Sequence, residues 1–265
     1  MKIGVFDSGF GGLTVLRELL AAIPQADYLY LGDTARLPYG SKSAATVARY
    51  AVSSVEFLVQ NGAEYVVIAC NTASALAMQQ IRAAVRAEVL GVIAPGARAA
   101  SAITRSKNVY VIGTAATIAS HAYRRELESL GVTAFEKACP LFVPLVEEGW
   151  IDHPVAEQVA HIYLRELEEE QRDRNSSADV LVLGCTHYPL LKPLLRRILP
   201  DSLQLVDSAQ ATAHDAAAAL GVRGASSRRP AVQFFATDSV EKFQLLGSRF
   251  LQREIDRVAL ITLPE

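Results

Sequence analysis

Cysteine is scarce in this chain, with three residues among 265. Cys70 and Cys185 each follow a strand-like apolar run, and this placement fits free thiols in a reducing compartment better than a disulfide framework. A strong excess of charge is also lacking, because the formal net charge is −2. The electrostatics therefore give no reason to expect a nucleic-acid partner, and the short basic stretch 223–229 is expected to be a solvated loop.

Long apolar runs are absent as well, since polar or charged residues interrupt each one before it reaches the length of a membrane helix. The chain enters a strand-like run at Lys2–Phe6 and has no signal-peptide pattern. We therefore expect a cytoplasmic protein with no membrane partner. Hydrophobic residues still make up 51% of the chain, which predicts a globular fold with a large core.

Short β-rich runs alternate with amphipathic helical runs, and this alternation predicts a parallel α/β architecture. Strands are expected at Lys2–Phe6, Tyr28–Leu31, Tyr65–Ala69, Val89–Ile93, Val109–Ile112, Thr133–Lys137, Val180–Leu183, Gln204–Val206, Val232–Ala236 and Val258–Thr262. Helices are expected at Leu13–Ile23, Ala45–Gln60, Ala75–Val85, Thr117–Leu130, Pro154–Gln171, Leu190–Leu199, Gln210–Leu220 and Val240–Leu251.

A weak internal repeat suggests two related halves. The stretch 2–14 resembles 108–120, and both are expected to form a strand, a tight turn and a helix with Ser8 and Thr114 at matching positions. A similar spacing separates the two cysteine loops. We expect the first α/β domain to comprise 1–93 plus 208–265 and the second to comprise 94–207. Ligands of parallel sheets bind beyond the carboxyl ends of the strands, so the loops at 7–12, 32–40, 70–74, 113–117 and 184–188 are expected to converge on a crevice between the halves.

The two thiols suggest paired bases that remove a proton from one face of a carbon and return one to the other. A free thiol has a pKa near 8.5 and needs help to ionise at neutral pH. His187, two residues after Cys185, is a candidate partner, and Asp7 is a candidate to help Cys70 across the crevice. Cys139 has no comparable setting and is expected to be a buried small residue.

Metal and cofactor chemistry fit the sequence poorly. Zinc sites usually need four ligands in close pairs, and only Cys185 has a histidine nearby. Neither crevice cysteine has the C-x-x-C spacing of a redox motif. A pyridoxal enzyme needs a Schiff-base lysine, and only Lys42 lies near a candidate loop. We expect no metal and no cofactor.

Two candidate roles remain open for several charged residues. Asp7 is either a cap for the helix at Leu13 or a functional carboxylate. Asp33 and Arg36 either contact a ligand or only stabilise their own loop. Glu147 either faces the crevice near His187 or begins a solvated helix.

Hydroxyl groups and backbone N–H groups, with few arginines near the motifs, suit a small dicarboxylic amino acid. The residues expected to bind it are Ser8, Pro38, Tyr39, Gly40, Thr72, Thr114, Thr117 and Thr186.

These motifs together resemble those of the glutamate racemase family, within the cofactor-independent aspartate/glutamate racemase superfamily. The matching stretches are D-S-G-F-G-G, G-D-T-A-R-L-P-Y-G, A-C-N-T-A-S, V-I-A-P-G-A-R-A-A, V-P-L-V-E-E-G and G-C-T-H-Y-P-L-L. The resemblance implies two α/β domains related by a pseudo-twofold axis, with the substrate between them. It further implies a bacterial cytoplasmic homodimer that supplies D-glutamate for peptidoglycan.

The resemblance also implies a role for each site residue. Cys70 would deprotonate D-glutamate and Cys185 L-glutamate, with Asp7, Glu147 and His187 as auxiliary ionisable groups. Substrate would be bound by Asp7, Ser8, Tyr39, Gly40, Asn71, Thr72, Thr186 and His187. The alternatives are an aspartate or hydantoin racemase, a decarboxylase relative with one cysteine, and a two-lobed binding protein for an acidic amino acid.

Overall fold

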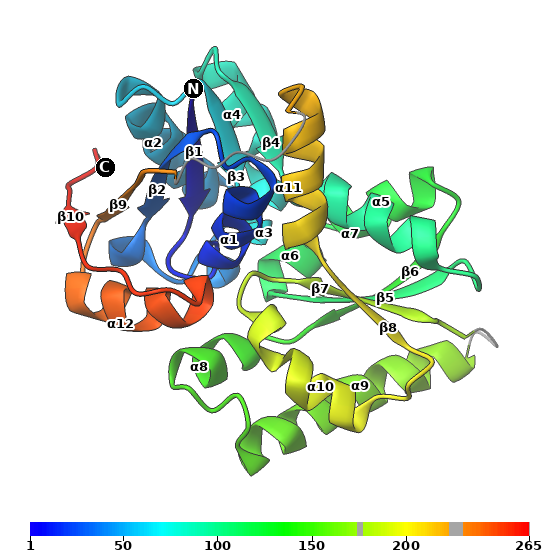
Figure 1. Cartoon of the computed structure of the whole chain (residues 1–265). Helices are drawn as coiled ribbons and strands as arrows, with labels where there is room; N and C mark the ends of the chain where they lie inside the picture. Colours follow the sequence, from blue (N-terminus) through cyan, green and yellow to red (C-terminus); the bar gives the residue numbers. More distant parts are fainter. Residues whose placement is uncertain (174–176, 223–229, 265) are drawn as a thin grey trace.

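The computed structural model describes residues 1–173, 177–222 and 230–264, and the basic stretch 223–229 lies outside them. Within these residues the strands form two separate sheets, one at the upper left and one at the lower right of Figure 1. The first has the order β10-β9-β2-β1-β3-β4 and the second has the order β6-β5-β7-β8. Every neighbouring pair is parallel, which confirms the predicted α/β architecture with mainly parallel sheets.

The strands are β1 (Lys2–Asp7), β2 (Asp27–Gly32), β3 (Tyr65–Ile68), β4 (Glu88–Gly91), β5 (Asn108–Gly113), β6 (Thr133–Ala138), β7 (Val180–Gly184), β8 (Gln204–Asp207), β9 (Val232–Ala236) and β10 (Val258–Leu260). The α-helices are α1 (Leu13–Ala22), α2 (Ala44–Gln60), α3 (Asn71–Leu76), α4 (Met78–Ala84), α5 (Ile93–Ile103), α6 (Ala115–Ala119), α7 (Ala122–Ser129), α8 (Phe142–Glu147), α9 (Pro154–Asp173), α10 (Lys192–Ile198), α11 (Ser208–Ala219) and α12 (Val240–Leu251). Three 3₁₀ turns in the described part of the chain are η1 (Thr34–Arg36), η2 (Tyr39–Ser41) and η3 (Tyr188–Leu191).

The internal repeat is visible in the strand order. The run β2-β1-β3-β4 of the first sheet has the same connectivity as β6-β5-β7-β8 of the second. Ser8 follows β1 and Thr114 follows β5, while Cys70 and Cys185 follow β3 and β7. The repeat therefore brings each hydroxyl turn and each cysteine to the carboxyl edge of its own sheet. The strands β9 and β10 extend the first sheet beyond β2, and α11 packs against both α1 and α5.

The domain bounds 1–93 plus 208–265 and 94–207 stay a prediction. All strands of the first sheet lie within the first set of residues and all strands of the second within the second set. The helix α5 begins at Ile93, at the proposed boundary.

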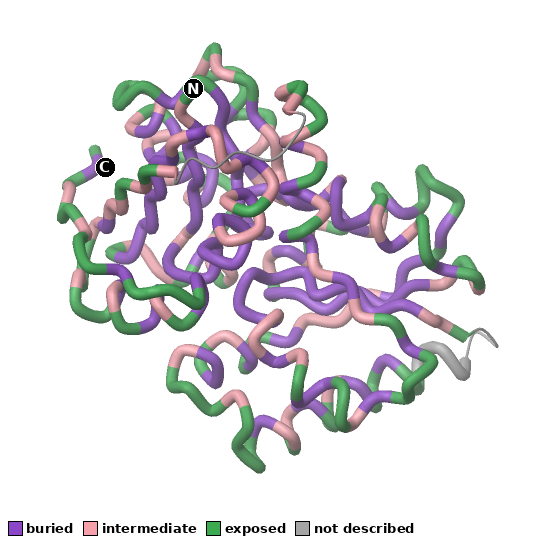
Figure 2. The backbone as a smooth tube through the Cα atoms, viewed as in Figure 1, coloured by how far each residue is buried: buried purple, intermediate pink, exposed green. Residues whose placement is uncertain are grey.

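The central strands are apolar on both faces because helices cover both sides of each sheet. The strand β7, with sequence V-L-V-L-G, is buried along its whole length, and β1 is buried from Ile3 onward. Figure 2 shows this buried backbone running through the middle of both sheets, with exposed residues on the outer helices and loops. Each fully buried Val, Leu or Ile contributes about 1.5–3 kcal/mol to stability.

Several helices differ from the prediction. The expected helix 75–85 is two helices, α3 and α4, and the expected helix 117–130 is divided into α6 and α7. The second break lies at His121, whose φ of 52° is left-handed and cannot continue a right-handed helix. The helices α5 and α8 are absent from the prediction because Pro95 and Pro144 obscure their pattern. Both prolines lie in the first turn, where a missing N–H is tolerated.

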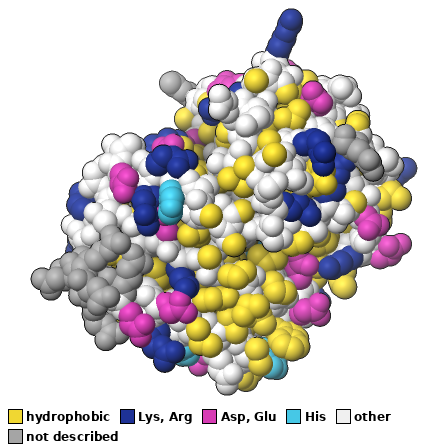
Figure 3. All heavy atoms as spheres, turned by 180° about the vertical axis from the view of Figure 1, so that it is seen from behind, with side chains coloured by type: hydrophobic (Ala, Val, Ile, Leu, Met, Phe, Trp, Pro, Cys, Tyr) yellow, Lys and Arg dark blue, Asp and Glu magenta, His cyan; other side chains and the backbone are white. Residues whose placement is uncertain are grey.

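The surface carries no large region of one charge sign on the face shown in Figure 3. Acidic and basic side chains are scattered there, and hydrophobic side chains gather towards the lower part of that face. None of the helices in the described ranges is long and apolar enough to span a membrane.

Candidate active site

We call the sheet β10-β9-β2-β1-β3-β4 with the helices on it the first unit, and the sheet β6-β5-β7-β8 with the helices on it the second unit. A cavity of about 30 Å³ lies between the two units, and the carboxyl ends of both sheets supply its walls. It is lined by Ser8, Leu37, Pro38, Tyr39, Gly40, Cys70, Asn71, Thr72, Thr114, Val143, Glu147, Cys185, Thr186 and His187. A space of this size holds on the order of two water molecules. This space is smaller than an amino acid.

Cys70 lies at the junction of β3 and α3 and is 5% exposed. Its Sγ accepts a hydrogen bond from the Ala73 N–H at 3.4 Å and lies 3.5 Å from Ser8 Oγ. Burial and, to a smaller extent, the nearby Asp7 carboxylate raise the pKa of the Cys70 thiol to about 12. An ionised Asp7 disfavours the thiolate of Cys70, because it places a second negative charge beside the sulfur. The role of Asp7 as an auxiliary group for Cys70 stays a prediction.

Cys185 follows β7 and has a different environment. Its Sγ lies 3.9 Å from His187 Nδ1, and His187 Nε2 lies 3.2 Å from Glu147 Oε1. Burial disfavours the imidazolium, but the contacts with Cys185 and Glu147 outweigh it and raise the pKa of His187 to about 10. Burial also opposes ionisation of Glu147, yet His187 and Lys242 together lower the pKa of that carboxyl below its usual range. Of the two roles left open for Glu147, the structure places it at the cavity, beside His187.

Replacing Glu147 by glutamine is expected to lower the pKa of His187, because the neutral amide no longer favours the imidazolium while burial still opposes it. In the native chain the raised pKa stabilises the fold fully below the unfolded-state value of about 6.5. This contribution is lost as the pH rises towards 10. The Glu147→Gln variant should therefore lose less stability across that window. NMR titration of the imidazole resonance gives the pKa directly, and an unchanged midpoint in the variant would contradict the assigned contact.

Asp7 lies behind the cavity and is not among the residues that line it. Its side chain is fully buried, its Oδ2 accepts a hydrogen bond from the Gly9 N–H at 2.9 Å, and burial raises the pKa of the carboxyl. Gly12 is the N-cap of α1 and makes no side-chain capping bond, so Asp7 does not occupy the cap position. Its carboxylate instead orders the glycine turn that precedes the helix.

Hydroxyl groups of both units meet beside the cavity. Thr72 Oγ1 of the first unit lies 3.0 Å from Thr114 Oγ1 and 3.2 Å from Thr117 Oγ1 of the second. Thr117 supports Thr114 from behind at 2.9 Å and does not itself line the cavity. Asn71 Oδ1 accepts a hydrogen bond from the Tyr123 hydroxyl at 2.7 Å, while its Nδ2 is buried without a partner among the described residues.

Two cavity residues, Leu37 and Val143, were not anticipated. Aliphatic side chains carry no chemical signature, so only their position beside Pro38 and within the motif of Glu147 could have indicated them. Both supply apolar wall to the cavity that the thiols line.

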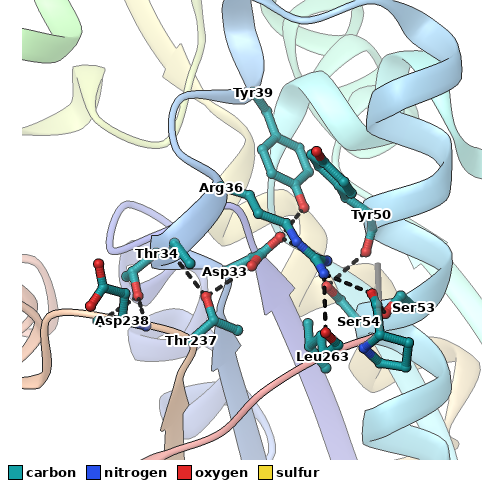
Figure 4. A network of polar contacts seen from close by, with 12 residues as sticks. Asp33, Thr34, Arg36, Tyr39, Tyr50, Ser53, Ser54, Thr237, Asp238 and Leu263 are labelled. Carbon is teal, nitrogen blue, oxygen red and sulfur yellow. Dashed lines mark hydrogen bonds and ion pairs between the residues drawn. The ribbon is translucent and has the colours of Figure 1, made fainter.

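The loop that carries Pro38, Tyr39 and Gly40 is held in place by the network in Figure 4. Asp33 Oδ2 accepts a 2.6 Å hydrogen bond from the Tyr39 hydroxyl, and Asp33 Oδ1 accepts one of 2.9 Å from Thr237. The Arg36 guanidinium donates to the carbonyl of Pro264 at 2.7 Å. Asp33 and Arg36 do not line the cavity, so the structure favours the loop-stabilising role for both.

Replacing Tyr39 by phenylalanine should lower the free energy of unfolding by about 1–3 kcal/mol, because the buried Asp33 carboxyl loses its closest donor. Urea denaturation measures the change. The matched control is Tyr50→Phe on the adjacent ring, which leaves Asp33 untouched and should change stability by less than about 0.5 kcal/mol. Equal changes in the free energy of unfolding for the two substitutions would show that the hydrogen bond from Tyr39 to Asp33 does not stabilise the fold.

A model of the Asp/Glu/Hydantoin racemase family matches residues 3–216. The chain belongs to this family. Among its relatives in the racemase family, the glutamate racemase of Koribacter versatilis is 54% identical over 98% of this chain and 97% of its own length.

Solved structures of family members have the same fold. Glutamate racemase isoform RacE1 from Bacillus anthracis superimposes with a TM-score of 0.91 at 36% identity, over 99% of this chain and 97% of that one. The glutamate racemase of Francisella tularensis, solved in complex with D-glutamate, has a TM-score of 0.87 at 33% identity, over 98% of this chain and 97% of that one.

Proposed function

We propose that this member of the racemase family is a glutamate racemase that interconverts L- and D-glutamate by proton transfer between two thiols, without a metal or cofactor. The observation that carries the proposal is that Cys70 of the first unit and Cys185 of the second line one closed cavity. The names of the bacterial relatives and the D-glutamate in the Francisella structure support glutamate as the substrate.

The chemistry exchanges one proton at each face of the α-carbon. Starting from D-glutamate, the Cys70 thiolate takes the α-proton, so that a C–H bond breaks and an S–H bond forms. The Cys185 thiol then delivers its proton to the opposite face and becomes a thiolate beside the His187 imidazolium. The reverse sequence converts L-glutamate. A positioned acid or base of this kind contributes about 10²–10⁴-fold to the rate.

Polar groups around the cavity hold the substrate and stabilise the carbanion-like intermediate. We assign this role to the hydroxyls of Ser8, Thr72, Thr114 and Thr186, with Thr117 fixing Thr114 from behind. The Nδ2 of Asn71, which has no partner in the described part of the chain, and the backbone N–H groups of Tyr39 and Gly40 are suited to a carboxylate. Donors fixed in place before the reaction stabilise developing charge more strongly than water does. Asp7 acts through the glycine turn beside Cys70 and is an auxiliary group in this scheme.

The wider role follows from the same proposal. The chain is proposed to work in the bacterial cytoplasm as a homodimer and to supply D-glutamate for peptidoglycan. Nucleic acid and membranes are not proposed partners.

The experiment starts from pure L-glutamate and follows circular dichroism. We expect the signal to decay to zero, and the signal of L-aspartate to decay at least about 100-fold more slowly. Faster decay with aspartate would identify an aspartate racemase instead. A persistent glutamate signal together with tight glutamate binding would identify a binding protein.

A further inference from the structure

Lys242 joins the two units at the rim of the cavity. It lies on α12 of the first unit, and its Nζ lies 3.2 Å from Oε2 of Glu147 on α8 of the second unit. The other carboxylate oxygen of Glu147 contacts His187, which in turn faces Cys185. A continuous series of polar contacts thus leads from an exposed lysine to one of the two thiols.

Exposure falls steeply along this series. The side chain of Lys242 is 51% exposed, that of Glu147 is 16% exposed and that of His187 is 6% exposed. An exposed ion pair contributes only about 0–1 kcal/mol to stability, so fold stability is a weak reason for this contact. Its consequence for Glu147 is geometric, because each carboxylate oxygen is fixed by a partner from a different side.

The contact between Lys242 and Glu147 also depends on the relative position of the two units. Because the closed cavity is smaller than an amino acid, the units must move apart to admit substrate. Lys242 and Glu147 lie on different units, so moving the units apart would separate this ion pair. The edge-to-face contact between His187 and Phe250, with ring centres 5.2 Å apart, crosses the same boundary.

The hydrogen-bond partners of the Cys70 sulfur among the described residues are Ser8 and Ala73, and both belong to its own unit. Within the described ranges, the series of polar contacts that starts at Lys242 therefore leads to Cys185 and not to Cys70.

We propose that Lys242 is a positioning residue for the Cys185 half of the reaction. On closure it orients the Glu147 carboxylate, which holds His187 against the Cys185 sulfur, so that this thiol is prepared only when substrate is enclosed. The inference rests on the proposed racemase function and adds a residue to its machinery.

The test replaces Lys242 by methionine, which keeps the length and apolar stem of the side chain and removes its charge. We expect kcat/KM for racemisation to fall at least about tenfold. Lys242→Arg should restore it to within about threefold, since a guanidinium also reaches the carboxylate. The matched control is Lys137→Met, which removes an ion pair with Glu166 away from the cavity and should change kcat/KM less than about twofold.

The decisive measurement follows α-proton exchange by each thiol separately, and we expect Lys242→Met to slow exchange by only one of the two. In a Cys70→Ala background, Lys242→Met should slow the Cys185-dependent exchange of the α-proton of L-glutamate in D₂O about tenfold. In a Cys185→Ala background, exchange of D-glutamate by Cys70 should be unchanged within about twofold. Equal slowing in both backgrounds, or native racemisation by Lys242→Met, would overturn the proposal. Failure of the proposed function itself is seen separately, because the native chain would then not racemise glutamate at all.

Discussion

We expect that replacing either Cys70 or Cys185 by alanine abolishes measurable glutamate racemisation. The loss of one positioned acid or base lowers kcat by about 10²–10⁴-fold. Each variant lacks the acid or base on one face of the α-carbon, while the remaining thiol keeps its own contacts. The remaining thiol should still exchange the α-proton of one enantiomer with solvent. We expect exchange of L-glutamate only in Cys70→Ala and of D-glutamate only in Cys185→Ala, as followed by proton NMR in D₂O.

The matched control is Cys139→Ala. Cys139 is also buried, but it lies outside the cavity, and the only hydrogen-bond partner of its Sγ among the described residues is the carbonyl of Lys137. This variant should keep near-native racemisation. Normal turnover by Cys70→Ala or Cys185→Ala would refute the assignment of the two bases.

Replacing Gly11 by alanine should reduce kcat/KM at least about 100-fold, because it keeps the two units from closing. A Cβ at Gly11 would lie 2.9 Å from Thr186 Cβ and 2.7 Å from His187 Nδ1, both in the second unit. Neither group can move away without a large cost in free energy. The position of Thr186 Cβ is fixed by the backbone, and His187 is packed against Cys185 and Glu147. Steady-state kinetics measures the loss.

A substitution at a second glycine, Gly131, distinguishes a loss of activity caused by blocked closure from one caused by a less stable fold. Gly131 has φ of +72°, and a Cβ there would have no neighbour within 4 Å. Gly131→Ala should therefore lower stability by about 1–2 kcal/mol through backbone strain and leave activity intact. Gly11→Ala should do the opposite, with near-native thermal unfolding and little activity. Full activity of Gly11→Ala would show that the units need not approach this closely.

The features that could be predicted from the sequence are local ones. Apolar runs indicated the strands, and the similarity of 2–14 to 108–120 indicated two units with matching turns. Because parallel strands end at one edge, the positions of Cys70 and Cys185 after their strands were enough to predict a shared site.

The features that could not be predicted depend on packing across the two units. The role proposed for Lys242 depends on its contact from α12 to Glu147 on α8, which no sequence pattern encodes. Ser8 and Thr114 line the cavity, but Asp7 and Thr117 do not. Asp7 is the last residue of β1, and Thr117 lies within α6, three residues after its N-cap Thr114. The sign of the effect of Asp7 on Cys70 also required knowledge of the burial of both groups.

The central claim is that two bases act from opposite faces, and isotope incorporation during racemisation in D₂O tests it most directly. Early in the reaction of L-glutamate, the account predicts deuterium in the D-glutamate formed and protium in the L-glutamate that remains. Equal labelling of both enantiomers at early times, which a single base serving both faces produces, would contradict it.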